Sequence, residues 1–270
     1  MPLRLNLPPT LRDRLAAADR PLYGLWIVSG SPVAAEIVAG SGIDLLWIDA
    51  EHSVNSLESV QAQLQVAAGY PVTPLVRIPV NDPVLVKQYL DLGAQNLIVP
   101  MVDSAEQAAE AVRAMHYPPR GIRGVGSALS RGARWNRVEG YLGRAPETIS
   151  LTVQIESATA VENAEAILAV DGVDAVFLGP SDLAASMGVL GQQNHPDVVA
   201  AVERVIGLAR AAGVKAGVNA FAPADAERYA AAGADFVFVG ADVALLARAT
   251  EAIVDRFIGD PAPGPARASY

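Results

Sequence analysis

The stretch Leu45–Ser53, LLWIDAEHS, decides the fold. Its first four residues are apolar without interruption, which indicates a strand buried on both faces, because a strand with one wet face alternates apolar and polar residues. The run ends abruptly in Asp49, Glu51 and His52. A buried strand that ends in titratable groups delivers them to the rim of a sheet or barrel. Other strands of the same kind would bring their own ends to that rim.

Seven further short apolar runs share this character. The eight expected strands are Gly24–Ser29, Asp44–Ala50, Thr73–Pro79, Asn96–Val102, Leu151–Glu156, Asp174–Leu178, Lys215–Ala220 and Asp235–Gly240. The segments between them have helical periodicity, as in Pro196–Ala212, where apolar residues recur at spacings of three and four. Eight strand–helix units in 270 residues, without a break in composition, predict an α/β fold, a single-domain TIM-type (β/α)8 barrel. The alternative is an open, doubly wound sheet.

The expected barrel occupies residues 1–258. Residues 259–270, GDPAPGPARASY, lack apolar anchors, and we expect a disordered tail. The longest connection, 103–150, starts as a helix and continues as YPPRGIRGVGSALSRGARWNR, a length of irregular chain that is usually functional or disordered. Two interpretations stay open: its arginines bind an anion at the barrel mouth, or the segment is an oligomer contact anchored by Trp135. The arginines are Arg120, Arg123, Arg131, Arg134 and Arg137.

Composition excludes several classes of function. The net charge of -9 argues against nucleic acid or an anionic membrane as a partner. The absence of cysteine excludes disulfides, thiolate metal sites and cysteine nucleophiles. No apolar stretch has the length of a signal peptide core or a membrane span, so we expect a cytoplasmic protein. The two lysines, Lys87 in a helix and Lys215 at the start of a strand, are poorly placed for a Schiff base.

Polar residues stand at the ends of several expected strands. Arg77 lies in LVRIP, Gln154 and Glu156 lie in VQIES, and Ser181 and Asp182 lie in FLGPSDL. In a (β/α)8 barrel the carboxyl ends of the strands open to one face, where catalytic residues collect. A charged residue inside an apolar strand is costly unless it faces a partner or a ligand. Together with the polar end of Leu45–Ser53, these residues therefore predict a site at the barrel mouth.

Glu156 and Asp182 end neighbouring strands, so their carboxylates can converge. Hard oxygen ligands, without cysteine or clustered histidine, suit Mg²⁺ or Mn²⁺ better than structural zinc. The alternative is that each carboxylate pairs with an arginine or caps a helix. His52 is open in the same way: beside acidic neighbours at a barrel mouth it can act as a general base, and in a loop it can equally be a surface residue.

The quoted motifs resemble those of one known family. IDAEH, VRIPVNDP, VPMV, YPPRGIRGVGSALSR, VQIES and FLGPSDL together are similar to the HpcH/HpaI class II pyruvate aldolases, and most of all to the branch acting on 4-hydroxy-2-oxoheptanedioate. The resemblance covers about Tyr23 to Phe257. It implies reversible retro-aldol cleavage of a 4-hydroxy-2-oxo acid to pyruvate (or hydroxypyruvate) and an aldehyde. It also implies a divalent metal ion (Mg²⁺, Mn²⁺ or Co²⁺), no Schiff-base lysine and no organic cofactor.

The resemblance also implies roles for individual residues. Glu156 and Asp182 would bind the metal, and Asp182 would also contact the substrate. His52 would be the general base, and Arg77 would stabilise negative charge on the substrate oxygen. The remaining substrate contacts would be Gln154 and the backbone of Ser181.

Two aspartates complete the implied site. Asp49 resembles the family's partner to the catalytic histidine, and Asp91, within YLDLG, resembles an aspartate that raises the basicity of that histidine. Asp91 ends a helix that runs away from its own barrel mouth, so it would have to act across a subunit boundary. This agrees with the homo-oligomers, hexamers built as trimers of dimers, that the family implies.

Two other functions stay open. One is a carbon–carbon lyase acting on a CoA thioester, as in relatives of citrate lyase β or malyl-CoA lyase, although no basic channel for the CoA moiety is evident in the sequence. The other is a non-catalytic barrel, against which the set His52, Arg77, Glu156 and Asp182 argues. The segment Lys215–Phe221 departs from the family pattern, which leaves the aldehyde selectivity open.

Overall fold

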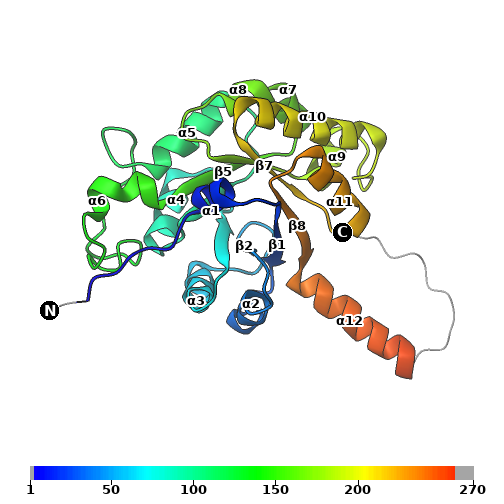
Figure 1. The fold of residues 1–270 in the computed structure, drawn as a ribbon, viewed down its shortest axis with the longest axis horizontal. Helices are drawn as coiled ribbons and strands as arrows, with labels where there is room; N and C mark the ends of the chain where they lie inside the picture. Colours follow the sequence, from blue (N-terminus) through cyan, green and yellow to red (C-terminus); the bar gives the residue numbers. More distant parts are fainter. Residues whose placement is uncertain (1–2, 259–270) are drawn as a thin grey trace.

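Eight parallel strands close into a barrel in the computed structural model, which describes residues 3–258 (Figure 1). The strands are β1 Leu22–Ile27, β2 Leu45–Asp49, β3 Thr73–Arg77, β4 Asn96–Val99, β5 Ser150–Ile155, β6 Ala175–Leu178, β7 Lys215–Asn219 and β8 Phe236–Ala241. Each overlaps one of the eight strands expected from the sequence. Because β1 pairs with both β2 and β8, the sheet has no free edge, and the barrel is confirmed over the open sheet.

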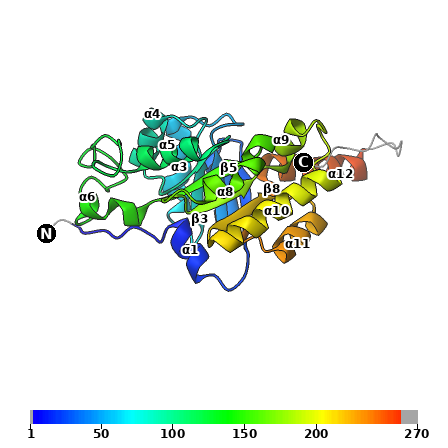
Figure 2. The same ribbon diagram turned by 90° about the horizontal axis from the view of Figure 1, so that it is seen from above.

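Helices follow the strands in the order expected for a (β/α)8 fold and, apart from α12, pack on the outside of the barrel (Figure 2). They are α1 Leu11–Ala17, α2 Pro32–Ala39, α3 Leu57–Ala67, α4 Pro83–Asp91, α5 Ala105–Met115, α6 Tyr141–Arg144, the 3-10 helix η1 Ala145–Thr148, α7 Ala158–Glu162, α8 Ala164–Leu168, α9 Pro180–Ser186, α10 Pro196–Ala212, α11 Pro223–Ala232 and α12 Asp242–Phe257. None of the helices in the described part is long and apolar enough to cross a membrane. The expected tail, 259–270, lies outside the described residues.

Aromatic rings fill the inside of the barrel. Trp47, Phe177, Phe236 and Phe238 are buried there and pack tilted or edge-on, with ring centroids 4.5–6.4 Å apart. A glycine makes room for this packing: a Cβ on Gly24 would lie 2.3 Å from the Phe238 ring. The apolar residues on the outer faces of the strands form a second, larger core under the helices.

Carboxylates and an amide join neighbouring strands at the amino-terminal end of the barrel, its base. Asp44, Asp174 and Asp235 each precede an even-numbered strand and accept a hydrogen bond from a backbone N–H of the odd-numbered strand before it, at 2.8–3.0 Å. Asn96, the first residue of β4, donates to a carbonyl of β3 and accepts from the first N–H of α1. These contacts fix the strand ends, because the three carboxylates and the Asn96 amide N–H₂ each join two adjacent strands, and the Asn96 oxygen joins α1 to β4.

The long connection between β4 and β5 packs against the helices and not at the mouth of its own barrel. Arg123 pairs with Asp91 at the end of α4 (3.0 Å), and Arg131 donates to backbone carbonyls at the ends of α3 and α4. Arg120 lies at the base, near the start of β6. The expectation of an arginine-lined anion site at the mouth is therefore wrong for these three residues within one chain. Their cationic groups instead meet backbone carbonyls and two aspartates, Asp91 and Asp171, at or just beyond helix carboxyl ends, where positive charge is stabilising.

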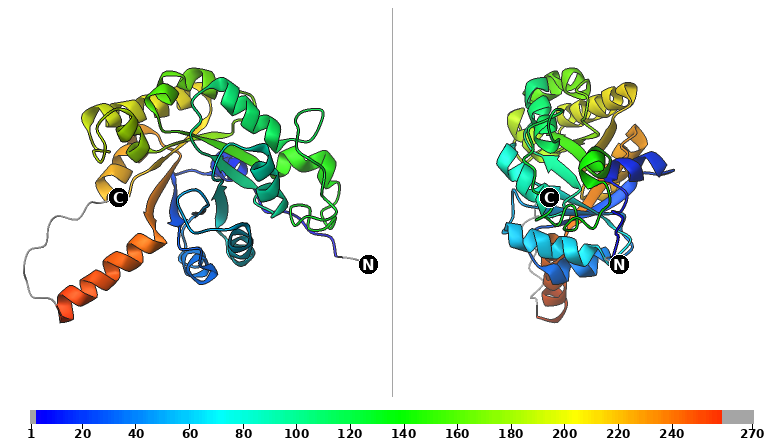
Figure 3. Two further views of the ribbon diagram at one scale, coloured as in Figure 1. Left: turned by 180° about the vertical axis from the view of Figure 1, so that it is seen from behind. Right: turned by 90° about the vertical axis from the view of Figure 1, so that its left-hand side faces the viewer.

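Helix α12 extends away from the rest of the molecule, and the views from the front and from behind agree on this (Figures 1 and 3). None of its residues is buried, and its large apolar side chains include Leu246, 67% exposed, and Phe257, 73% exposed. It contacts strands β1 and β8 rather than lying along α2 or α11. Helix α2, whose Val33 and Ile37 are exposed, lies on the same side of the molecule as α12 (Figure 1).

Candidate active site

The mouth of the barrel is organised around the guanidinium of Arg77, the last residue of β3. Arg77 is directly beside Asp49 in the strand register, and Nε and Nη2 donate to the two oxygens of Asp49 at 2.7 and 2.8 Å. Both side chains are almost fully buried. The guanidinium also lies over the Trp26 ring, 4.7 Å from its centroid. A bidentate pair of this kind fixes both the position and the orientation of the guanidinium group.

The third nitrogen of Arg77, Nη1, has looser partners. Glu51 Oε2 lies 2.8 Å from Nη1 but forms no well-aligned hydrogen bond with it, and the Gln154 oxygen is 3.5 Å away. Burial raises the pKa of Glu51, against the opposing effect of Arg77. Nη1 therefore keeps donor capacity that an incoming oxyanion can use.

Glu156 is held in place from two sides. Gln154 Nε2 donates to Glu156 Oε2 at 2.6 Å, and the backbone N–H of Met101 donates to Oε1 at 2.9 Å. Met101 has φ of +52°, an unusual backbone conformation for a residue with a side chain. Gln154, which we expected to contact substrate, thus also bridges Arg77 and Glu156. The strained turn after β4 serves to aim one N–H at this carboxylate.

Negative charge is in excess at this point of the barrel. Burial raises the pKa of Glu156 to about 7, and repulsion from Asp182 and Glu51 acts in the same direction. Asp182, in the first turn of α9, is exposed to solvent at the mouth. Carboxylates that repel each other around a buried member such as Glu156 favour either a proton or a cation between them.

Glu156 and Asp182 are oxygen ligands of the type that Mg²⁺ and Mn²⁺ prefer. Within residues 3–258 no cluster of three metal-ligating side chains is present. Two carboxylates are a usual protein contribution to a magnesium site, because water and substrate complete the shell. The donor set and its surplus charge therefore fit a divalent metal.

Gly179 leaves the space that the Glu156 carboxylate occupies. A Cβ at position 179 would lie 2.6 Å from Glu156 Oε2 and 3.1 Å from its Cβ. Any side chain at this position would displace the carboxylate from the place where Gln154 holds it. The glycine of FLGPSDL is thus required by the position of the carboxylate.

His52 lies in the turn after β2 and is exposed. It is near enough to Glu51 to lower that residue's pKa electrostatically. Asp49, which we expected beside His52, uses both carboxylate oxygens to hold Arg77. Its role in orienting His52 stays a prediction, and the structure adds that Asp49 positions the arginine.

Asp91 lies away from this group of side chains, at the end of α4, where it pairs with Arg123. Within one chain Asp91 therefore has the position expected from the sequence, at the end of a helix that leads away from the mouth. An action on His52 across a subunit boundary stays a prediction.

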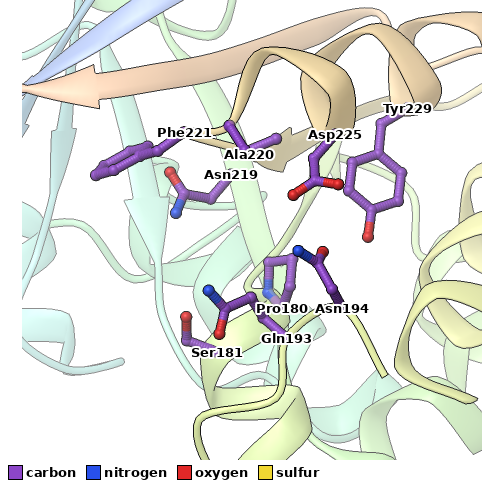
Figure 4. A pocket seen from close by; sticks show the side chains of 10 residues that line it. Pro180, Ser181, Gln193, Asn194, Asn219, Ala220, Phe221, Asp225 and Tyr229 are labelled. Carbon is purple, nitrogen blue, oxygen red and sulfur yellow. The ribbon is translucent and has the colours of Figure 1, made fainter. Parts of the chain in front are cut away.

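A cleft opens beside the carboxylates, between the start of α9 and the loop after β7 (Figure 4). The amide groups of Gln193, Asn194 and Asn219 point into it, and Ser181 lies at its edge. Trp26 Nε1 donates to Asn219 Oδ1 at 3.0 Å, which leaves the amide N–H₂ of Asn219 as the group available to a ligand.

Three contributors to this site were not identified from the sequence. The Met101 N–H gives no signal, because a positive φ at methionine cannot be inferred from composition. Gly179 lies within a motif that drew attention only for its serine and aspartate. Asn219 is the last residue of an apolar strand, as Arg77 is. A polar residue at that position is a sequence signal that could have identified it.

Comparisons with known proteins cover nearly the whole chain. A family profile described as HpcH/HpaI aldolase/citrate lyase matches residues 22–249. A Shigella sonnei protein named 4-hydroxy-2-oxo-heptane-1,7-dioate aldolase is 51% identical over 240 residues, covering 89% of this chain and 92% of the relative. Among solved structures, a Burkholderia cenocepacia HpcH/HpaI aldolase/citrate lyase family protein is 42% identical with a TM-score of 0.88, covering 92% and 99% of the two chains. An HpcH/HpaI aldolase from Desulfitobacterium hafniense is 33% identical with a TM-score of 0.85, covering 96% and 100%.

Proposed function

The chain belongs to the HpcH/HpaI aldolase/citrate lyase family, and we propose that it catalyses the reversible retro-aldol cleavage of a 4-hydroxy-2-oxo acid to pyruvate, or hydroxypyruvate, and an aldehyde. It is an aldehyde-lyase. The observation that carries the proposal is the convergence of Arg77, Glu156 and Gln154 at the mouth of a barrel whose curated relatives bear that activity in their names.

Glu156 and Asp182 are the residues that would hold a divalent metal, Mg²⁺, Mn²⁺ or Co²⁺. When bound, the ion would supply a Lewis acid for the keto oxygen of pyruvate. Arg77 Nη1 faces the same space with unused donor capacity, so it can stabilise the charge that develops on this oxygen. The Asp49 pair keeps the guanidinium from turning away while that happens.

His52 is the proposed general base. In the direction of synthesis it removes a proton from the methyl carbon of pyruvate, the resulting carbon nucleophile attacks the aldehyde carbonyl, and the protonated imidazole gives its proton to the new alkoxide oxygen. In cleavage the same imidazole removes the proton of the C4 hydroxyl as the C3–C4 bond breaks, and then returns it to the carbon that becomes the methyl group of pyruvate. The exposed position of His52 lets it exchange this proton with water. Glu51, between the histidine and Arg77, is suited to hold a water molecule for the transfer.

The cleft in Figure 4 is the proposed site of the aldehyde. It begins at Ser181, directly before Asp182, and its amide groups can donate and accept hydrogen bonds without carrying charge. Hydroxylated aldehydes such as glycolaldehyde would therefore be better matched to it than unsubstituted alkyl aldehydes, which offer no hydroxyl group to the N–H₂ of Asn219.

Proton exchange tests this function without any assumption about the aldehyde. We expect the protein to exchange the methyl protons of pyruvate with D₂O, chelation by EDTA to stop the exchange, and Mg²⁺ or Mn²⁺ to restore it. Exchange that survives chelation would overturn the metal-dependent reaction. Condensation assays with pyruvate and glycolaldehyde or succinic semialdehyde, beside an assay of malyl-CoA cleavage, then separate the aldolase from a thioester lyase.

We further propose that the protein works as a homo-oligomer, with hexamers as trimers of dimers as the form implied by the family resemblance. Support comes from α12, whose apolar side chains Leu246, Ile253 and Phe257 are 58–73% exposed. A second copy of the chain can cover that face, because within residues 3–258 no helix lies along the side of the barrel between α2 and α11. An oligomer would also allow Asp91 of one subunit to approach the site of another.

Light scattering after size-exclusion chromatography tests the oligomer. Leu246→Glu should shift the mass toward monomer, whereas Arg248→Glu, on the same helix and without an apolar side chain, should shift it less. A monomeric parent protein would contradict the proposal. The cytoplasmic location expected from the sequence stays a prediction.

A further inference from the structure

The imidazole of His52, the proposed base, is exposed and receives no hydrogen bond from any residue between 3 and 258. A general base has to stand within hydrogen-bond reach of the proton that it removes. The side chain of His52 has nothing of its own to keep it there. Its position therefore comes from the backbone of the turn that carries it, residues 50–54.

This turn is closed on one atom, the backbone carbonyl oxygen of Asp49. Asn55 Nδ2 donates to that oxygen at 2.6 Å, and Ser53 Oγ donates to it at 2.5 Å. Ser53 Oγ in turn accepts the backbone N–H of Asn55 at 3.0 Å. His52 thus lies between two residues, 49 and 55, that are bonded to each other across the turn. Because the Asp49 carboxylate holds Arg77, the turn and the guanidinium share one anchor.

The amide of Asn55 is itself oriented from α3. Its Oδ1 accepts a hydrogen bond from Gln63 Nε2 at 2.6 Å and a second from Ser59 Oγ at 2.9 Å. A carbonyl oxygen can only accept, so the Asn55 nitrogen has to face Asp49 and its oxygen has to face α3. Rotation of the amide by half a turn would bring two oxygens together at Asp49. The two donors on α3 prevent that rotation.

Gln63 is a buried polar residue that the core does not need. It is 0% exposed, and it lies on the buried face of α3 with Val60, Leu64 and Ala67. Its Oε1 is buried without a hydrogen-bond partner. An apolar side chain of similar size would fill this place without leaving a polar atom unpaired. A residue that costs stability where it stands indicates a purpose other than packing, and its one printed bond goes to Asn55.

We propose that Asn55 and Gln63 are positioning residues for the base: Gln63 orients the Asn55 amide, and Asn55 holds the His52 turn against the end of β2. The inference rests on the proposed function, in which His52 moves the proton. It gives Asp49 a link to His52 through its backbone carbonyl, whereas its carboxylate holds Arg77. Base and arginine are thereby kept in register with each other.

Three variants separate positioning from stability. Asn55→Ala removes the donor to Asp49. Gln63→Met removes one donor to Asn55 and fills the core with an apolar side chain. Gln65→Met makes the same exchange at an exposed position of the same helix and is the matched control. Each variant is measured as the full-length, Mg²⁺-loaded protein by exchange of the methyl protons of pyruvate with D₂O.

We expect kcat to fall while binding stays intact. Asn55→Ala should lower kcat of exchange by about 100-fold, the effect of moving a reacting group by roughly 1 Å. Gln63→Met should lower it by about tenfold, a smaller displacement, because Ser59 still donates to Asn55. KM for pyruvate and the affinity for Mn²⁺ should equal those of the parent. The free energy of unfolding of Gln63→Met should equal or exceed that of the parent, and Gln65→Met should behave as the parent throughout.

Backbone deuterium uptake tests the positioning without reference to the reaction. The peptide covering residues 49–55 should take up deuterium faster in Asn55→Ala and Gln63→Met, and at the parent's rate in Gln65→Met. Unchanged uptake in the first two variants would overturn the inference. So would a parent-like kcat in both, or a loss of Mn²⁺ affinity and pyruvate binding in step with a loss of stability.

His52→Gln, measured beside these variants, keeps the two proposals apart. Loss of exchange in His52→Gln, with parent-like exchange in Asn55→Ala and Gln63→Met, would overturn the positioning alone. Parent-like exchange in His52→Gln would remove the histidine from its proposed role, and the positioning of a base would fall with it.

Discussion

At the base of the barrel three carboxylates each have a cation of their own, whereas at the mouth four carboxylates surround one arginine. Asp44, Asp174 and Asp235 pair with Arg20, Arg12 and Lys215 at 2.7–3.1 Å, and each also accepts a backbone N–H. At the mouth, Asp49 and Glu51 share Arg77, and Glu156 and Asp182 have no basic side chain in direct contact in the described part.

The difference shows which end of the barrel is built for stability and which for binding. A carboxylate with its own cation and N–H donor has its charge neutralised within the fold, and it holds two strands together. Carboxylates in excess of cations destabilise the fold through repulsion unless a positive ligand arrives. Catalytic residues of (β/α)8 barrels lie at the mouth for the same reason that structural residues lie at the base: the loops at the mouth leave room for a ligand.

The largest expected effect follows from removing one carboxylate of the mouth. Glu156→Gln should lower pyruvate proton exchange by about 10³-fold, the scale seen when one preorganised electrostatic group is lost. The fold should survive, because glutamine keeps an acceptor for the Met101 N–H and removes a buried charge. Exchange rates and urea unfolding of the same sample check both parts. Exchange close to that of the parent would show that the surplus charge has no catalytic purpose.

A pH dependence of stability should appear in the metal-free protein. The pKa of Glu156 is about 7 in the folded chain against an ordinary 4.5, so folding favours its protonated form. Stability is then full below pH 4.5 and falls as pH rises toward 7, by roughly 3 kcal/mol in total, since one pKa unit corresponds to about 1.4 kcal/mol. Urea unfolding from pH 5 to pH 8 in EDTA measures it. Glu156→Gln should flatten the curve, and a curve as steep as the parent's would assign the effect to other groups.

A smaller effect should follow from filling the space beside the carboxylate. Gly179→Ala places a Cβ 2.6 Å from Glu156 Oε2, so the carboxylate has to leave the position in which Gln154 holds it. We expect metal affinity to fall by about 10–100-fold, as for changes that displace a ligand without removing it. Gly143→Ala, where nothing lies within 4 Å of the added carbon, is the matched control. Calorimetric titration with Mn²⁺ compares the two.

The smallest effect is expected at the base. Asp235→Asn keeps an acceptor for the Ala216 N–H and loses only the pair with Lys215, whose side chain is 40% exposed. The free energy of unfolding should drop by about 1 kcal/mol or less, and pyruvate exchange should not change. A loss of exchange comparable to that of Glu156→Gln would remove the distinction between the two ends.

The sequence predicted the barrel because its strands are buried on both faces. A run such as Leu45–Ile48 has no wet side, so its length and its polar end can be recognised without knowing its neighbours. The residues at the mouth were predicted for the same reason, since Arg77 and Glu156 interrupt or end runs in which charge is costly.

Partnerships at the site could not be predicted in this way. Asp49 lies near His52 in the sequence, yet both its oxygens bind Arg77, because parallel register places residues 49 and 77 side by side. The Met101 N–H reaches Glu156 only through a backbone conformation that has no sequence signal. The direction of α12 was equally hidden, since an amphipathic helix has the same pattern whether it covers its own barrel or another chain.

Mn²⁺ binding measured by calorimetry on three proteins tests the contrast between mouth and base most directly. The parent and Asp235→Asn should each bind one Mn²⁺ per chain with the same affinity, and Glu156→Gln should show no saturable binding at the same concentrations. Equal binding by Glu156→Gln and the parent would contradict the account, because the surplus carboxylates of the mouth would then not be the metal site.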